Sequence, residues 1–123
     1  MSTAHYAGLN AAADVYLDSL DWSGGNTTLE AIAAGLPIVT LPGRFLRGRV
    51  SHGIMRRMGL TDAVAHSTAD YVSHAVRLGL DAAWRAEQAA RVTAQAVSLY
   101  GDTAPVEALQ EHFCSALDTA AAR

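Results

Sequence analysis

The stretch 22–42, WSGGNTTLEAIAAGLPIVTLP, constrains the fold of this chain more than any other segment. An apolar segment at 14–18 precedes it and predicts a buried strand that ends in acidic residues. A glycine-rich turn, a helix over 27–34 closed by Gly35, and a second buried strand over 37–41 are expected to follow. This order predicts a βαβ unit, which places a helix N-terminus beyond the carboxyl end of a parallel strand. A diphosphate group can bind at such a position.

The remaining segments predict more helix than strand. A chain of 123 residues has the size of one small domain, and a parallel sheet of two or three strands is narrow for an α/β fold, which normally buries both sheet faces. We therefore predict the α/β class, with a short parallel sheet and several C-terminal helices, and interpret 1–123 as a single partial domain that lacks earlier βα units. The further expected elements are a helix over 4–13, a short strand over 63–65, and helices over 50–58, 67–78, 82–99 and 105–119.

Composition excludes several classes of partner. The net charge is −3 and the chain contains no lysine, so a basic nucleic-acid-binding surface is not expected. No apolar run approaches the roughly 18 residues of a membrane span, and the first residues lack the pattern of a signal peptide. The single cysteine and the scattered histidines give no metal-ligand spacing. We expect a cytoplasmic protein with neither nucleic acid nor membrane as a partner, and without a metal site.

The turn that opens the first predicted helix carries the candidate binding residues. The first N–H groups of a helix lack intrahelical partners and carry the positive end of its dipole, so they can bind a diphosphate without a cation. Gly24 and Gly25 allow close approach of a ligand, while the hydroxyls of Thr27 and Thr28 add side-chain donors. The alternative is that the glycines only turn the chain and that Thr27 only caps the helix. The residues alone leave both interpretations open.

Two charged residues near this turn also have alternative roles. Glu30 completes a capping-box pattern with Thr27, but an acidic residue at this place can also accept hydrogen bonds from ribose hydroxyls. Arg49 lies where a basic loop becomes a helix, after the second strand, and could neutralise phosphate. Arg44 and Arg47 in the same loop are expected to be solvated. A dehydrogenase-type dinucleotide site is not expected, since the G-x-G-x-x-G spacing is absent.

With these motifs in place, the chain resembles a known family. The segments DVYLDSLDWSGGNTTLEAIAAGLPIVTLPG, RGRVSHGIMRRMGLTD and DYVSHAVRLGLD are similar to the C-terminal part of the O-linked N-acetylglucosamine transferase (SPINDLY-like) glycosyltransferases. The resemblance extends over about 9–117. It implies a GT-B enzyme whose Rossmann-like C-terminal domain holds UDP, with the acceptor approaching from across the interdomain cleft.

The resemblance also implies roles for particular residues. Gly25, Asn26, Thr27 and Thr28 would contact the diphosphate, and the resemblance favours the ribose for Glu30. The resemblance also places Arg49 near this motif, without assigning it a definite role. The reaction implied is transfer of a sugar, typically N-acetylglucosamine, from UDP to Ser or Thr hydroxyls, with inversion and without a cofactor or required metal; the helix dipole and donors would stabilise the leaving diphosphate.

The chain departs from the family pattern in three ways. Asn26 stands where the animal enzymes have histidine, there is no lysine for the phosphate contact, and the N-terminal catalytic half is missing, together with the helical repeats that bind acceptor proteins. We therefore predict no catalytic residue here. We expect a UDP-sugar-binding segment that is incomplete alone and needs an upstream catalytic half. The alternative is a non-catalytic remnant that binds nucleotide weakly or docks on a protein partner.

Overall fold

The computed structural model describes residues 3–121, which form helices around a very short parallel sheet. Most of the expected elements are present, and the strands are shorter than predicted. In chain order the elements are α1 (Thr3–Ala12), β1 (Tyr16–Leu17), α2 (Asn26–Ala33), β2 (Ile38–Val39), a 3₁₀ turn (Leu46–Gly48), α3 (Val50–Arg57), α4 (Thr68–Leu80), α5 (Ala82–Gln95), a second 3₁₀ turn (Ala96–Leu99) and α6 (Ala104–Ala121).

The predicted βαβ unit is confirmed. Strands β1 and β2 pair in parallel, with Tyr16 opposite Ile38, and α2 makes the connection between them. The third strand expected over 63–65 is reduced to one parallel bridge, between Thr40 and Val64. The carboxyl ends of both strands therefore lie on one edge of the sheet, where the chain continues into the glycine-rich turn and the basic loop.

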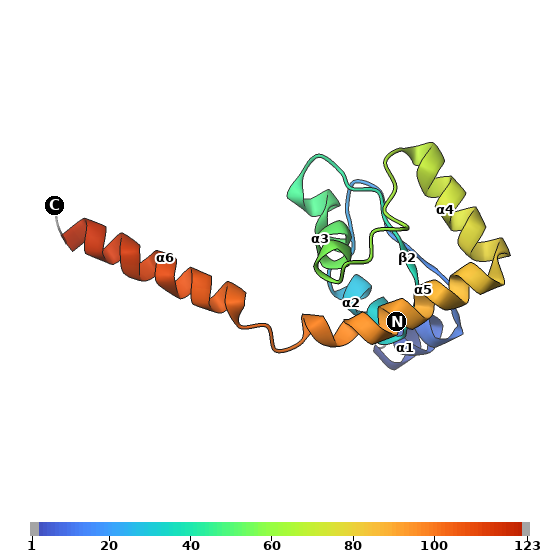
Figure 1. Cartoon of the computed structure of the whole chain (residues 1–123), viewed down its shortest axis with the longest axis horizontal. Coiled ribbons are helices and arrows are strands. Elements are labelled where there is room, and N and C mark those ends of the chain that lie inside the picture. The colour runs from blue at the N-terminus through green and yellow to red at the C-terminus, as the bar shows by residue number, and fades with distance from the viewer. Residues whose placement is uncertain (1–2, 122–123) are drawn as a thin grey trace.

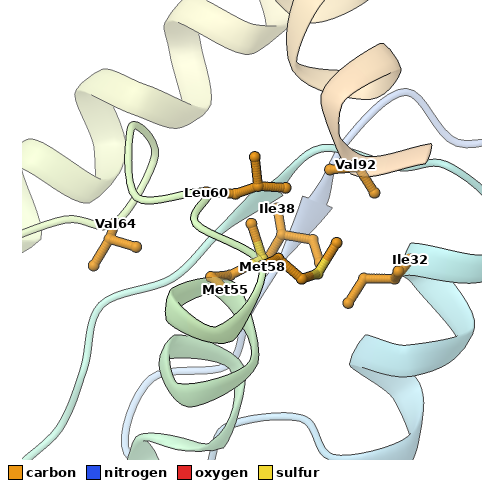
Figure 2. Close-up of a cluster of buried hydrophobic side chains, with 7 residues drawn as sticks. All are labelled: Ile32, Ile38, Met55, Met58, Leu60, Val64 and Val92. Atoms are coloured by element: carbon orange, nitrogen blue, oxygen red, sulfur yellow. The ribbon is translucent and has the colours of Figure 1, made fainter. Parts of the chain in front are cut away.

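Neighbouring residues of β2 supply the two halves of the core, because successive side chains of a strand point to opposite faces. Ile38 joins the cluster drawn in Figure 2, which α2, α3 and α5 also supply. Val39 packs on the other face with Ala63, Leu78 and Trp84. Helices therefore cover both faces of the sheet, as the α/β class requires. The cluster in Figure 2 consists of Ile32, Ile38, Met55, Met58, Leu60, Val64 and Val92.

Local chemistry explains where the helices begin and end. Gly35 has a φ of +75°, and the Leu36 N–H donates to the Ala31 carbonyl at 3.0 Å, which closes α2 with the glycine predicted for that role. Ser67 accepts from the Asp70 N–H at 3.1 Å at the start of α4. Asp81 caps α5 by accepting from the Trp84 N–H at 2.9 Å. These predicted boundaries are confirmed.

The last helix, α6, extends away from the rest of the molecule (Figure 1). Every side chain from 104 to 120 is exposed. An ion pair of 2.9 Å between Arg57 and Asp102 fixes the segment just before it. The exposed apolar residues Val106, Leu109, Phe113 and Leu117 recur at helical spacing along α6. None of the described helices combines the length and the apolar character that crossing a bilayer requires.

Candidate functional site

A buried carboxylate holds the glycine-rich turn in place. Asp18 follows β1 directly, is only 3% exposed, and accepts three hydrogen bonds. The donors are the Ser23 hydroxyl at 2.7 Å, the Thr40 hydroxyl at 2.7 Å and the Gly24 backbone N–H at 2.8 Å. Asp18 thus connects the end of β1 to the turn and to the end of β2. The Asp18 side chain is therefore buried within the protein and is not solvated.

The network continues through hydroxyl groups into α2 and α3. The Ser51 Oγ lies 2.8 Å from the Ser23 Oγ and 2.7 Å from the Thr28 Oγ1, and the Thr28 hydroxyl also donates to the Gly24 carbonyl at 3.0 Å. Thr28 and Ser51 are both 0% exposed. The structure therefore does not support the predicted contact between the Thr28 hydroxyl and a diphosphate. Thr28 positions the turn from behind.

The two adjacent glycines of the turn have different surroundings. A Cβ atom at Gly24 would lie 2.4 Å from the Tyr16 hydroxyl and 2.6 Å from the Thr27 and Thr28 Oγ1 atoms, so any larger residue would clash. A Cβ atom at Gly25 would meet nothing within 4 Å. Packing therefore explains the glycine at Gly24. The space in front of Gly25 is open to a ligand.

The N-terminus of α2 is uncapped. Gly25 is the N-cap residue and provides no side-chain hydrogen bond. Within residues 3–121, the backbone N–H groups of Gly25, Asn26 and Thr27 have no partner, whereas those of Thr28 and Leu29 bond the Gly25 carbonyl. The capping-box interpretation of Thr27 and Glu30 is wrong, because Thr27 lies inside the helix and its Oγ1 lies 3.0 Å from the Tyr16 hydroxyl. Three donors at the positive end of the helix dipole are left for an anion.

A cavity of about 350 Å³ lies between α1 and the middle and C-terminal end of α2. Glu30 contributes to its wall and is on the same stripe of α2 as Asn26, one helical turn further on. Alanines form most of the rest of the lining, so the walls are apolar and leave room. The lining residues are Tyr6, Ala7, Asn10, Ala11, Glu30, Ala33 and Ala34.

Arg49 is exposed and forms the start of α3, as predicted, but its guanidinium group is used locally. Its Nη1 donates to the Gly43 carbonyl at 2.9 Å, which closes the basic loop. The same loop contacts the turn, since the Ser23 N–H donates to the Arg47 carbonyl at 2.7 Å. The structure thus brings the loop against the glycine-rich turn. Arg49 keeps its Nε and Nη2 donors, which no described residue engages, so a phosphate could bind it without displacing the Gly43 carbonyl.

Two titratable groups near the site have shifted pKa values. Burial, followed by the charges of Arg49 and Arg56, lowers the pKa of His52 from its ordinary value. Both effects disfavour the imidazolium form, so His52 contributes less positive charge beside the basic loop than an ordinary histidine would. Burial, followed by the Asp18 charge, raises the pKa of Tyr71, whose hydroxyl donates to the Asp18 carbonyl at 2.8 Å. Over residues 3–121 no three acidic, histidine or cysteine side chains are grouped as metal ligands.

The sequence did not predict the buried hydrogen-bond network around Asp18 or the position of Asn10 in the cavity wall. Thr40 and Ser51 stand 22 and 33 residues after Asp18 in the chain, a separation that local spacing does not reveal. One sequence feature could have identified Asn10: it is the single side-chain amide in an alanine-rich helical segment. Such a side chain must either find a hydrogen-bond partner or be exposed to water.

Comparisons with known proteins bear on this geometry. The profile of glycosyl transferase family 41 matches residues 7–101. The UDP-N-acetylglucosamine--peptide N-acetylglucosaminyltransferase of Caenorhabditis elegans is 39% identical over 80 residues, which is 65% of this chain and 7% of that protein. A probable UDP-N-acetylglucosamine--peptide N-acetylglucosaminyltransferase SPINDLY of Oryza sativa subsp. japonica is 35% identical over 68 residues, or 55% of this chain and 7% of that protein.

A solved structure supports the same relationship. A mutant O-GlcNAc transferase of Thermobaculum terrenum superposes with a TM-score of 0.86 at 30% identity, over 98% of this chain and 24% of that chain. The chain thus spans 7% of the length of the curated relatives named above and about a quarter of the solved one. The predicted family and the predicted α/β fold of the GT-B type are confirmed. The chain belongs to glycosyl transferase family 41.

Proposed function

We propose that this chain is the UDP-sugar-binding segment of an inverting, cytoplasmic protein O-glycosyltransferase that transfers N-acetylglucosamine to Ser or Thr. The observation that carries the proposal is the uncapped N-terminus of α2, where the N–H groups of Gly25, Asn26 and Thr27 have no partner among the described residues and the space before Gly25 is open. The names of the relatives, which contain UDP-N-acetylglucosamine, support this choice of donor.

In this reaction the leaving diphosphate needs stabilisation more than any other group. The acceptor hydroxyl oxygen forms a bond to the anomeric carbon, the bond from that carbon to the β-phosphate oxygen breaks, and the electron pair leaves with UDP. Donors that already point at the developing charge lower the barrier without reorganising. The N–H groups of Gly25, Asn26 and Thr27 would provide them, and the α2 dipole adds positive potential. We propose that no metal is required.

Glu30 is proposed to bind the ribose. Glu30 lies about 6 Å beyond Asn26 along α2, at 1.5 Å per residue. A nucleotide whose phosphates lie at the helix N-terminus would extend along α2 toward this carboxylate and the cavity beside it. No partner of the carboxylate within residues 3–121 competes for this role, which fits an acceptor for ribose hydroxyls.

The proposed segment is incomplete without other parts of the enzyme. Those parts would contribute the group that accepts the proton of the acceptor hydroxyl and the repeats that bind acceptor proteins; both would come from an upstream catalytic half. The complete absence of lysine favours a second candidate, a non-catalytic remnant that binds nucleotide weakly or docks on a protein. If the chain is instead part of an active enzyme, the positive charge that neutralises the diphosphate would have to come from Arg49 or from the upstream catalytic half.

Calorimetric titration of the purified chain with UDP tests the proposal, with Gly25→Ala and Glu30→Gln as variants and EDTA present in a parallel series. We expect saturable binding that EDTA leaves unchanged and that both variants weaken. Gly53→Ala is the control, because a Cβ atom at this exposed α3 position also meets nothing within 4 Å. A folded chain that binds no UDP would refute the proposed function and favour the remnant.

A further inference from the structure

The side chain of Asn10 is the one buried polar group of the described residues whose nitrogen lacks a partner. Asn10 is 6% exposed, and its Nδ2 has no hydrogen bond within residues 3–121. Leaving a buried donor unpaired costs roughly 1–3 kcal/mol. Buried polar groups are normally paired, so an exception calls for an explanation, such as a ligand that supplies the missing acceptor.

The position of Asn10 indicates which ligand could do so. Asn10 and Tyr6 are four residues apart on α1, on the face that lines the cavity, and Glu30 lines the same cavity from α2. The walls between them are alanines. Apolar walls with a few polar groups are typical of sites for small organic molecules. Here the polar groups include a carboxylate, which only accepts, and a carboxamide, which donates and accepts.

We infer that the Asn10 carboxamide hydrogen-bonds the nucleobase of the donor nucleotide, while Glu30 binds its ribose. This inference rests on the proposed function and identifies a further residue of that site. A nucleoside diphosphate with its phosphates at the α2 N-terminus extends past Glu30, which brings its base into the cavity between α1 and α2. Base edges carry carbonyl and ring-nitrogen acceptors that can pair the Nδ2, and rotation of the carboxamide presents its oxygen to a ring N–H.

Side-chain amide signals in an NMR spectrum of the ¹⁵N-labelled full chain test this inference directly. The sequence has two asparagines, Asn10 and Asn26, and three glutamines, Gln88, Gln95 and Gln110, so only five side-chain NH₂ pairs arise. The pair that disappears in Asn10→Ala is assigned to Asn10. We expect UDP to shift this pair and inorganic pyrophosphate, which has no nucleoside, to leave it in place.

Affinities of the same variant separate a binding role from a structural one. We expect Asn10→Ala to weaken UDP binding about tenfold, the effect of one lost hydrogen bond of about 1.4 kcal/mol. Its affinity for pyrophosphate should stay within about twofold of wild type, and its stability should be unchanged or higher, because an unpaired buried group is removed. Gln110→Ala, on the exposed helix α6, is the matched control and should change neither affinity.

The outcomes distinguish the inference from the proposed function. If UDP binds but leaves the Asn10 signals in place, and Asn10→Ala binds UDP as wild type does, the inference is overturned and the proposed function stands. If Asn10→Ala loses UDP and pyrophosphate equally, the residue has a structural role and the inference is also overturned. If the folded wild-type chain binds neither probe, the proposed function is refuted and the inference with it.

Discussion

Thr40→Val tests whether the buried network at Asp18 stabilises the fold. Thr40 is 0% exposed, and its hydroxyl donates to the Asp18 Oδ2 at 2.7 Å. Valine has nearly the same shape, so the substitution removes the donor without opening a cavity. Asp18 keeps the Ser23 hydroxyl and the Gly24 N–H as donors. The variant therefore measures one hydrogen bond to a buried carboxylate.

The expected loss of stability follows from the type of hydrogen bond. A bond to a charged group contributes about 1.5–3 kcal/mol, and a central value of about 2 kcal/mol is expected for Thr40→Val. The free energy of unfolding of a chain of this size falls with urea concentration at a slope of about 1.5 kcal/mol per molar, so the unfolding midpoint should fall by about 1.3 M. The slope itself should not change, because the surface exposed on unfolding is the same.

Urea unfolding followed by tryptophan fluorescence provides the assay, because Trp84 is buried in the core against Val39 and Leu78. Thr61→Val is the control: Thr61 is exposed, its hydroxyl makes no hydrogen bond to the described residues, and its replacement should change stability by less than about 0.5 kcal/mol. Equal midpoints for the two variants would refute the argument. In an Asp18→Asn background the effect of Thr40→Val should become smaller, because the charge has gone.

Three further predictions concern backbone conformation, ligand access and pH. Gly24→Ala should destabilise the chain by about 1–3 kcal/mol through its clash with Tyr16, whereas Gly25→Ala should keep the fold and weaken UDP binding. Stability is measured by urea unfolding and UDP affinity by calorimetry, and equal changes of both quantities in the two variants would contradict the prediction. Gly79→Ala, inside α4 with open space around it, should stabilise by about 0.5–1 kcal/mol, while Gly59→Ala, at a φ of +69°, should destabilise by about 1 kcal/mol, as measured by thermal unfolding. A hydrogen bond from Arg91 lowers the pKa of Asp62, so its stabilising effect is present above the ordinary aspartate pKa of about 4 and is lost as the pH falls through the lowered folded pKa. Asp62→Asn should therefore cost less than about 1 kcal/mol at pH 7, since the pair is exposed, and the difference from wild type in urea unfolding should shrink toward pH 3; a constant difference would contradict it.

The boundaries that could be predicted depend on residues with strong local preferences. Gly35, Gly59 and Gly101 all have positive φ, and each lies where the sequence indicated a break. Ser67 and Asp81 cap the helices that follow them. Such residues act on the chain within a few positions, so their effect can be read without knowledge of the tertiary structure.

The start of α2 could not be predicted in the same way. Thr27 and Thr28 both have the chemistry of a helix cap, yet their hydroxyls bond Tyr16 and Ser51, which are distant in sequence. With both hydroxyls engaged, the helix begins at Asn26 after an uncapped Gly25. Tertiary partners thus moved the helix start by one residue and left the N–H groups unpaired. The turn was recognised from its glycines, but only the fold distinguishes Gly24, fixed by packing, from Gly25, which faces open space.

The position of α6 has a consequence for spectroscopy of the chain. The 18-residue helix α6, whose side chains are exposed from 104 to 120, is held mainly by its own hydrogen bonds and lacks the tertiary packing that gives most protein helices their stability. Far-ultraviolet ellipticity should therefore decline gradually on warming, before the body melts cooperatively. Fluorescence of Trp84, within that body, should stay constant over the same range and then change sharply. The two signals would give different apparent melting temperatures for one molecule.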